Sequence, residues 1–262
     1  MTNKTTRIIA VWGGFLILCV AVFIVVPAIP QDLSYHNFAN SGALWGVPNF
    51  ADVVSNIPFV FVGIMGLWTV AKLPYAMLSH EHWFWLIFFV GVLLVGFGSG
   101  YYHWTPNNST LVWDRLPMTI GFMSLFAFVI FDRMGRWHGL VLLPILLVLG
   151  SSSVFYWDYT ESLGAGDLRP YAIVQFGPFL FIISLFLLFS SHYTGGKYFV
   201  RVFLWYALAK VFEHFDHGIY QISHGMVSGH TLKHLASAMA CYEVIQYLRM
   251  RRLLPKTKSS VV

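Results

Sequence analysis

The stretch WFWLIFFVGVLLVGFGSGYY, residues 83–102, decides the fold class of this chain because it carries no charged residue. A helix rises about 1.5 Å per residue, so a helix of this length crosses the roughly 30 Å hydrocarbon core of a bilayer. His103 follows the stretch directly. A polar side chain at the end of such a segment is costly unless a partner or a ligand satisfies it.

The rest of the sequence repeats this pattern and predicts eight apolar segments. They are Ile8–Val26, Val53–Val70, Trp83–Tyr102, Trp113–Phe131, Leu140–Tyr156, Tyr171–Phe189, Phe199–Phe215 and Thr231–Leu248. The chain is 57% hydrophobic and only 10% charged, whereas soluble domains carry about 25% charged residues. Helices are the expected element, because backbone in lipid must satisfy its own hydrogen bonds and no segment alternates like a barrel strand. We predict an all-α fold, a polytopic transmembrane helical bundle.

We expect three parts along the chain: a transmembrane anchor in residues 1–30, a seven-helix transmembrane domain in residues 31–250, and a basic cytosolic tail in residues 251–262. The anchor also resembles a signal sequence, with Lys4 and Arg7 ahead of the apolar run and Val26-Pro27-Ala28 as a cleavage site. Its apolar run is long for a signal sequence, so we expect it to be retained.

The basic residues predict the orientation of the bundle. With the N-terminus inside, twelve of the sixteen Lys and Arg residues fall on the inner side: Lys4, Arg7, Lys72, Arg133, Arg136, Lys197, Arg201, Arg249, Arg251, Arg252, Lys256 and Lys258. Cytoplasmic loops of membrane proteins carry such an excess. Both termini are therefore expected in the cytosol. The basic residues form no single patch, so the net charge of +5 does not indicate nucleic-acid binding.

Five polar residues are expected at one membrane depth on the outer side: Ser99, His103, Asp114, His230 and His234. The third segment runs outward, and the fourth and eighth begin outside, so all five reach the same interface although about 135 positions separate them. Residues four apart share a helix face. His230 and His234 can therefore point together, and so can Ser99 and His103.

Three imidazoles at one depth predict a zinc site. Zinc takes histidine nitrogens in tetrahedral geometry, and three protein ligands leave the fourth position for water. Zinc lowers the pKa of that water and polarises a carbonyl oxygen. Asp114 is then the candidate to move the proton of the water, and Ser99 the candidate to hydrogen-bond the water or the developing oxyanion.

Other interpretations fit these residues singly. Ser99 lies in Gly96-Phe97-Gly98-Ser99-Gly100, which is also typical of close helix packing. Asp114 suits the N-terminal end of a helix. Transmembrane histidines can also bind haem, but here they occur with Ser and Asp rather than as facing pairs.

The residues in order resemble a known family. The set Ser99-x-x-x-His103, Asp114 and His230-x-x-x-His234 is similar to that of a seven-helix superfamily containing alkaline ceramidases, progestin and adipoQ receptors and lipid-remodelling proteins. Three stretches resemble the ceramidase branch: SNIPF (55–59), GSGYYHWTPN (98–107) and WDRLPM (113–118). The resemblance covers about residues 45–250, with the first segment as an extra helix ahead of the seven.

The resemblance implies a zinc-dependent amide hydrolase in the membrane that cleaves ceramide or a related N-acyl lipid to a free amine and a fatty acid. His103, His230 and His234 would bind the zinc, and Ser99 and Asp114 would be catalytic. The active site would lie near the periplasmic or luminal face. The alternative within the superfamily is a lipid receptor or sensor that retains the zinc site.

Two further sites depend on less specific signals. Ceramidases of this type are similar in an acidic N-terminal loop that binds calcium, but here Asn49-x-x-Asp52 stands where Glu-x-x-Asn is expected. Calcium prefers several carboxylates, and the loop offers few, so the sequence predicts no tight calcium site.

Asp216 and His217 lie near the expected zinc depth. They are candidates for binding the substrate headgroup, with helix capping as the other interpretation.

Overall fold

The computed structural model describes residues 4–73 and 80–255, and within these residues the elements are helices without a β-strand. The eight long helices are α1 (Lys4–Val25), α3 (Ile57–Lys72), α5 (His82–Trp104), α6 (Asn108–Arg133), α7 (Arg136–Ser162), α8 (Arg169–Leu188), α9 (Gly196–His214) and α11 (Gly229–Met250). The shorter ones are the 3-10 helix η1 (Leu33–His36), α2 (Phe50–Val54) and α10 (Asp216–Ile222). The protein is an all-α polytopic membrane bundle, which confirms the predicted fold class.

Within the described residues, six stretches are long and apolar enough to cross a membrane: α1, α2 with α3, α5, α6, α7 and α8. The other two long helices, α9 and α11, are interrupted by charged side chains such as Lys210 and Glu213 in α9 and Lys233 in α11. Buried or lumen-facing charge inside a membrane bundle is a functional signal by default. The half-buried charges of α9 and α11 therefore indicate that these two helices contribute to a functional site.

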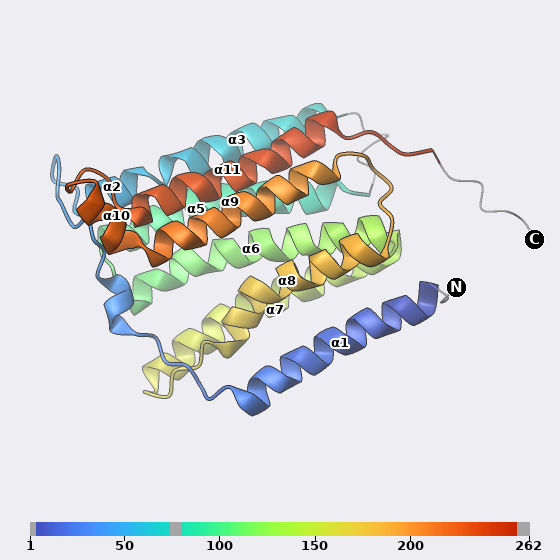
Figure 1. The fold of residues 1–262 in the computed structure, drawn as a ribbon, viewed down its shortest axis with the longest axis horizontal. Helices are drawn as coiled ribbons and strands as arrows, with labels where there is room; N and C mark the ends of the chain where they lie inside the picture. Colours follow the sequence, from blue (N-terminus) through green and yellow to red (C-terminus); the bar gives the residue numbers. More distant parts are fainter. Residues whose placement is uncertain (1–3, 74–79, 256–262) are drawn as a thin grey trace, which may run out of the picture.

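The long helices run side by side along one common direction (Figure 1). α5 packs against α3 and α6, and α11 packs against α9 and α3. The start of α1 and the end of α11 lie at the same end of the bundle, and η1, α2 and α10 lie at the opposite end (Figure 1). We refer to these as the terminal end and the loop end.

The helix α1 lies outside the seven others. None of its residues is buried, and it meets the bundle through Trp12 and Phe15, whose rings pack on Phe181 of α8 with centroids 4.7 and 5.1 Å away. Arg169 at the start of α8 donates a 2.8 Å hydrogen bond to Val26 O and so holds the end of α1. This matches the expectation of one helix added to a seven-helix core.

The start of α6 is fixed by local sequence. Asn107 and Thr110 form a capping box, in which each side chain accepts from the other's backbone N–H. Pro117 inside α6 cannot donate to Trp113 O, four residues earlier. Gly98 of α5 lies against that oxygen, and a Cβ at position 98 would come within 2.0 Å of it. Glycine thus lets α5 approach α6 closely, and this contact places Ser99 beside the first turns of α6.

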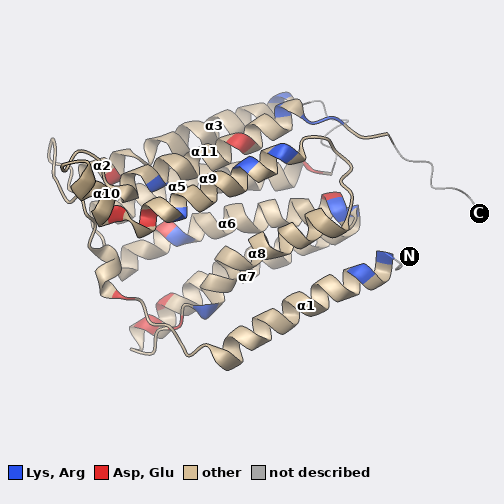
Figure 2. Cartoon of the chain, viewed as in Figure 1, with Lys and Arg blue, Asp and Glu red and all other residues tan. Residues whose placement is uncertain are grey.

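The terminal end contains the first residues of the expected basic tail. Arg251 is not a free tail residue, because its side chain is fully buried and pairs with Glu81. Leu253 forms an isolated bridge with Tyr193. Residues 256–262 lie outside the described residues. Figure 2 shows most Lys and Arg residues of the described chain at the terminal end and most acidic residues nearer the loop end.

Candidate metal centre

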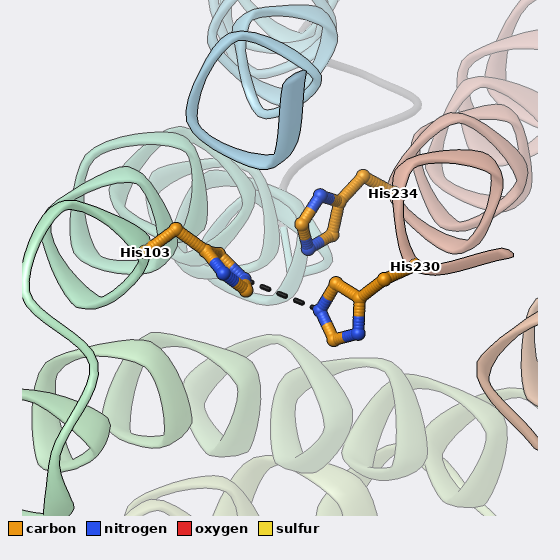
Figure 3. A group of neighbouring side chains, drawn as sticks. All are labelled: His103, His230 and His234. Atoms are coloured by element: carbon orange, nitrogen blue, oxygen red, sulfur yellow. Dashed lines mark hydrogen bonds between the residues drawn. The ribbon is translucent and has the colours of Figure 1, made fainter. Parts of the chain in front are cut away.

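Three histidines meet at the loop end of the bundle. His103 comes from the last turn of α5, and His230 and His234 come from the first two turns of α11. Their exposed fractions are 0%, 4% and 2%. One ring nitrogen of each lies within 4.8 Å of the others, and Figure 3 shows the three rings turned toward one another. Within the described residues, this is the one group of three or more His, Cys, Asp or Glu side chains with such spacing.

The spacing of the nitrogens suits a tetrahedral ion. His103 Nε2 and His230 Nε2 are 3.3 Å apart (Figure 3). Two ligands at about 2.0–2.1 Å from a tetrahedral zinc are about 3.3–3.4 Å apart. A pair of histidines this close shares at most one proton between the two nitrogens, so the arrangement already presents lone pairs to the centre.

The tautomer of His234 follows from its neighbour. Ser55 Oγ donates its one proton to Asp52 O at 3.0 Å, so His234 Nδ1–H must be the donor in the 2.7 Å contact with Ser55 Oγ. His234 Nε2 then carries a lone pair. That atom is buried and has no hydrogen-bond partner in the described chain. An orphaned acceptor beside two other imidazoles fits a metal ion, and the serine holds the ring in the required orientation.

The start of α11 is held by two buried carboxylates. Asp216 accepts from the backbone N–H of His230 at 2.7 Å and from that of Ala39 at 2.9 Å. Asp52 Oδ1 accepts from Thr231 Oγ1 at 2.7 Å. The contact with His230 satisfies a backbone N–H in the first turn of α11, which has no partner within the helix. These carboxylates therefore position the two α11 histidines rather than facing the centre themselves.

The loop before α2 covers the histidines. Phe38 is 7% exposed, and its ring lies 4.5 Å from the rings of both His103 and His230, measured between centroids. Asn49 donates to His103 O at 2.8 Å and ties the loop to the end of α5. An apolar ring over polar ligands limits water at the site and strengthens electrostatic interactions there.

A cavity of about 330 Å³ begins beside the histidines and runs into the bundle. This volume is in the range of small-molecule sites, about 300–1,000 Å³. Ser99, Asp114 and His234 line it. Within the described residues neither Ser99 nor Asp114 has a hydrogen bond or ion pair with another side chain. Deeper in the bundle its wall is apolar and includes Phe88, Val92, Phe122, Leu125 and Val244.

The polar part of the cavity wall also contains Lys210, Glu213 and Lys233. Glu213 lies between the two lysines: Lys210 Nζ donates to one carboxylate oxygen, and Lys233 Nζ donates to the other at 3.1 Å. Lys233 Nζ also donates to His230 Nε2 at 3.0 Å. His230 Nε2 is therefore an acceptor, as a metal ligand must be, and the ammonium has to withdraw toward Glu213 when a cation binds.

Tyr35 of η1 connects this charged group to the loop. Burial, followed by the nearby Glu213 carboxylate, raises the pKa of Tyr35 to about 12. Its hydroxyl therefore stays protonated at neutral pH and donates to Glu213 Oε1 at 3.4 Å.

The structure brings the five main candidates together at one end of the bundle and leaves the other two, Asp216 and His217, outside the cavity wall. The carboxylate of Asp216 accepts hydrogen bonds from the backbone N–H groups of Ala39 and His230. His217 is exposed, and its Nε2 lies 3.2 Å from Asn37 O. Their predicted contact with substrate has no support in this geometry.

The connection between α1 and α3 offers four residues with side-chain oxygens of the kind that calcium binds, Asp32, Asn40, Asn49 and Asp52, and each has a different hydrogen-bond partner. Asp32 caps η1 by accepting from Ser34 N at 2.8 Å, and Asn40 accepts from Gly42 N at 3.2 Å. Asp52 is buried against α11, and Asn49 faces α5.

Sequence reasoning missed several residues around the site. Ser55, Phe38 and Lys233 contact the histidines, and Arg115 lines the cavity. A signal existed for two of them: Ser55 lies in the SNIPF stretch, and Arg115 is a charge inside an apolar segment. Phe38 gave no signal, because one aromatic residue in a long connection predicts nothing about its contacts.

Fold and site together define a polytopic membrane protein with a buried three-histidine centre, compatible with a metal ion, beside a largely apolar cavity. The family model described as Ceramidase matches residues 44–203, more than half of the chain, and includes Ser99, His103 and Asp114. The chain therefore belongs to the ceramidase family. Membership indicates a membrane-embedded hydrolase that acts on the amide bond of a lipid. A comparison with curated protein sequences gave no significant match.

Proposed function

We propose that this protein is a zinc-dependent hydrolase that cleaves ceramide or a related N-acyl lipid to a free amine and a fatty acid. The observation that carries the proposal is the lone pair of His234 Nε2, buried without a partner and facing two other imidazoles. His103, His230 and His234 would hold the ion through Nε2. Zinc bound there lowers the pKa of water to about 7 and polarises a carbonyl oxygen.

The side chains around the centre have separate roles in this proposal. Asp114 takes the proton of the attacking water and returns it to the amine as the C–N bond breaks. Ser99 donates a hydrogen bond to the oxygen on which negative charge develops. Both line the cavity without a competing side-chain partner in the described chain. Ser55 keeps His234 in the ligating tautomer, and Phe38 excludes water.

The cavity suits a lipid with one polar region. Its polar wall lies beside the histidines, and its apolar wall extends between the helices. An acyl chain that moves from the bilayer into the apolar part stays in an apolar environment, so this transfer costs little. The scissile amide would then lie at the boundary, next to Ser99 and Asp114.

We also propose an orientation. The terminal end carries most of the basic residues (Figure 2), and positively charged ends usually face the cytosol. Both termini would then be cytosolic. The centre, at the loop end, would face the periplasm or a lumen.

The test uses the full-length protein in detergent. The metal is removed with a chelator, and zinc is returned at increasing ratios while fatty acid release from ceramide is measured. We expect hydrolysis to rise with zinc and to saturate near one ion per chain. His234→Ala should stay inactive at every ratio, whereas His138→Ala, an exposed histidine at the start of α7, should behave like the wild type. A zinc-saturated protein that releases no fatty acid from ceramides or simple N-acyl amines would refute the proposal.

A further inference from the structure

The side chain of Arg115 is buried in the cavity wall without a carboxylate partner. It is 5% exposed, it lines the cavity, and no Asp or Glu oxygen in the described chain lies within 4.0 Å of its nitrogens. Removing a guanidinium from water is costly unless charge and hydrogen bonds offset the loss. Such a group inside a membrane bundle calls for a functional explanation.

The contacts of Arg115 hold it rigidly and leave one nitrogen unused. Its guanidinium carbon lies 4.2 Å from the ring centroid of Trp157 and 4.8 Å from that of Tyr171. Nη2 donates to Gln31 Oε1 at 2.7 Å. Nη1 is buried and has no partner in the described chain. Cation–π contacts stabilise and orient a desolvated guanidinium, but they do not use the hydrogen-bonding capacity of Nη1.

The neighbouring charges do not supply the missing anion. Glu213 is shared by Lys210 and Lys233, and Asp114, adjacent in sequence, points elsewhere because consecutive helix residues do not face each other. The charged residues of the cavity wall are three cations, Arg115, Lys210 and Lys233, and two carboxylates, Asp114 and Glu213. One positive charge remains uncompensated even with both carboxylates ionised.

The cations are connected through one side chain. The guanidinium carbon of Arg115 lies 5.7 Å from the centroid of Tyr35, and the hydroxyl of Tyr35 donates to Glu213. Lys233 in turn contacts His230. The excess positive charge is therefore part of the same polar region as the histidines, where the amine half of a substrate would lie if the acyl chain fills the apolar part.

We propose that Arg115, supported by Lys210 and Lys233, binds an oxyanion on the amine-bearing half of the substrate, so that the preferred substrate is an anionic N-acyl lipid. The inference rests on the proposed function for the position of the amide. A carboxylate or a phosphate supplies the same chemistry, a planar or tetrahedral group of acceptor oxygens that guanidinium binds through parallel hydrogen bonds. Ceramide itself carries only hydroxyl groups there.

The test compares lipids that differ only in this group. One pair is N-palmitoylglycine, which ends in a carboxylate, and N-palmitoylethanolamine, which ends in an alcohol. The other is ceramide 1-phosphate and ceramide. For each, kcat/KM is measured with zinc-loaded full-length protein, and Kd is measured with metal-free protein by calorimetry in neutral detergent. We expect the anionic member of at least one pair to be preferred about 10- to 100-fold, as charge-assisted hydrogen bonds predict.

Three variants assign that preference to Arg115. Arg115→Gln should lower the anionic-to-neutral ratio about tenfold through KM and Kd, with the neutral lipid little affected, and Arg115→Lys should restore part of the ratio. Arg136→Gln, an exposed arginine at the start of α7, should leave the ratio unchanged.

Three results would overturn the inference. One is equal binding of anionic and neutral lipids by the wild type in both pairs. The second is an Arg115→Gln variant that loses both members of a pair equally, as a purely structural arginine would. The third is an Arg115→Gln variant that changes only inhibition by the palmitate product. If the zinc-loaded protein hydrolyses no lipid, the proposed function fails, and the calorimetric ratio still decides whether the anion site exists.

Discussion

At the terminal end of the bundle buried cations are matched with carboxylates, whereas at the loop end they face a cavity. Arg251 pairs with Glu81, which also accepts from Tyr193 and from Trp85 Nε1. Arg133 lies beside Asp132. None of these six side chains lines the cavity. At the terminal end these charged side chains therefore neutralise one another in ion pairs.

At the loop end the pairing is incomplete. Buried nitrogens without a hydrogen-bond partner occur at both ends, for example Arg251 Nη2 at the terminal end and Arg115 Nη1 at the loop end. Arg251, however, pairs with a carboxylate, whereas Arg115 has none in the described chain, and one carboxylate, Glu213, serves two lysines. A buried polar atom without a partner costs about 1–3 kcal/mol. Burial of charge alone therefore does not mark a functional site in this bundle. What distinguishes the loop end is unmatched charge next to a cavity.

Substitution of a histidine should have the largest effect on hydrolysis. His103→Ala removes one of three ligands, and we expect activity to fall at least about 10⁴-fold, because the several kcal/mol that the metal provides are lost. The measurement is kcat/KM for fatty acid release at saturating zinc. Activity within tenfold of the wild type would mean that His103 holds no catalytic ion.

Substitution of Asp114 separates proton transfer from metal binding. Asp114→Asn keeps the shape but cannot accept the proton, so kcat should fall about 10²- to 10⁴-fold. Zinc content should stay at the wild-type value, because Asp114 is not among the clustered ligands. Loss of the metal together with the activity would contradict this division of roles.

Substitution of Ser55 tests the orientation of His234. Ser55→Ala removes the acceptor of His234 Nδ1–H, and we expect zinc affinity to fall about 10- to 100-fold. Competition with a chelator of known affinity measures this change. Ser153→Ala is the matched control, because this buried hydroxyl donates only within its own helix, to Gly150 O. If the two variants bind zinc with equal affinity, Ser55 does not orient His234 for zinc binding.

Substitution at the terminal end should have the smallest effect on hydrolysis and a clear effect on stability. Glu81→Gln leaves the buried guanidinium of Arg251 without its counter-charge, which typically costs about 3–5 kcal/mol. Thermal unfolding in detergent should therefore begin at lower temperature, while kcat of the folded fraction stays within about twofold. Arg252→Gln, at the exposed next residue, should change neither. A Glu81 variant with normal stability and reduced kcat would contradict the assignment of a structural role to the terminal end and a functional role to the loop end.

The helices were predictable from the sequence, and their ends less so. The segment expected at Trp113–Phe131 is the helix Asn108–Arg133, because the capping box at Asn107 starts it earlier than the apolar pattern does. The segment expected from Val53 is divided into α2 and α3 around Ser55 and Asn56. Apolar patterns report lipid contact, whereas local hydrogen bonds decide where a helix begins.

The meeting of the histidines was predictable for a physical reason. Helix direction fixed the depth of His103, His230 and His234, and a spacing of four fixed the shared face of the last two. The side chains that surround and orient the histidines come from other parts of the chain. Phe38 lies in the loop before α2, Ser55 lies in the turn after α2, and Glu213 lies in α9. No spacing rule links them to the histidines, so only the folded structure reveals them.

The most direct test of the account is the metal content of the purified protein. Elemental analysis of wild type and His234→Ala, prepared side by side in full-length form, should find about one zinc per wild-type chain and close to none in the variant. Equal metal content in the two proteins, or none in a folded and zinc-treated wild type, would contradict the claim that the three imidazoles bind one ion.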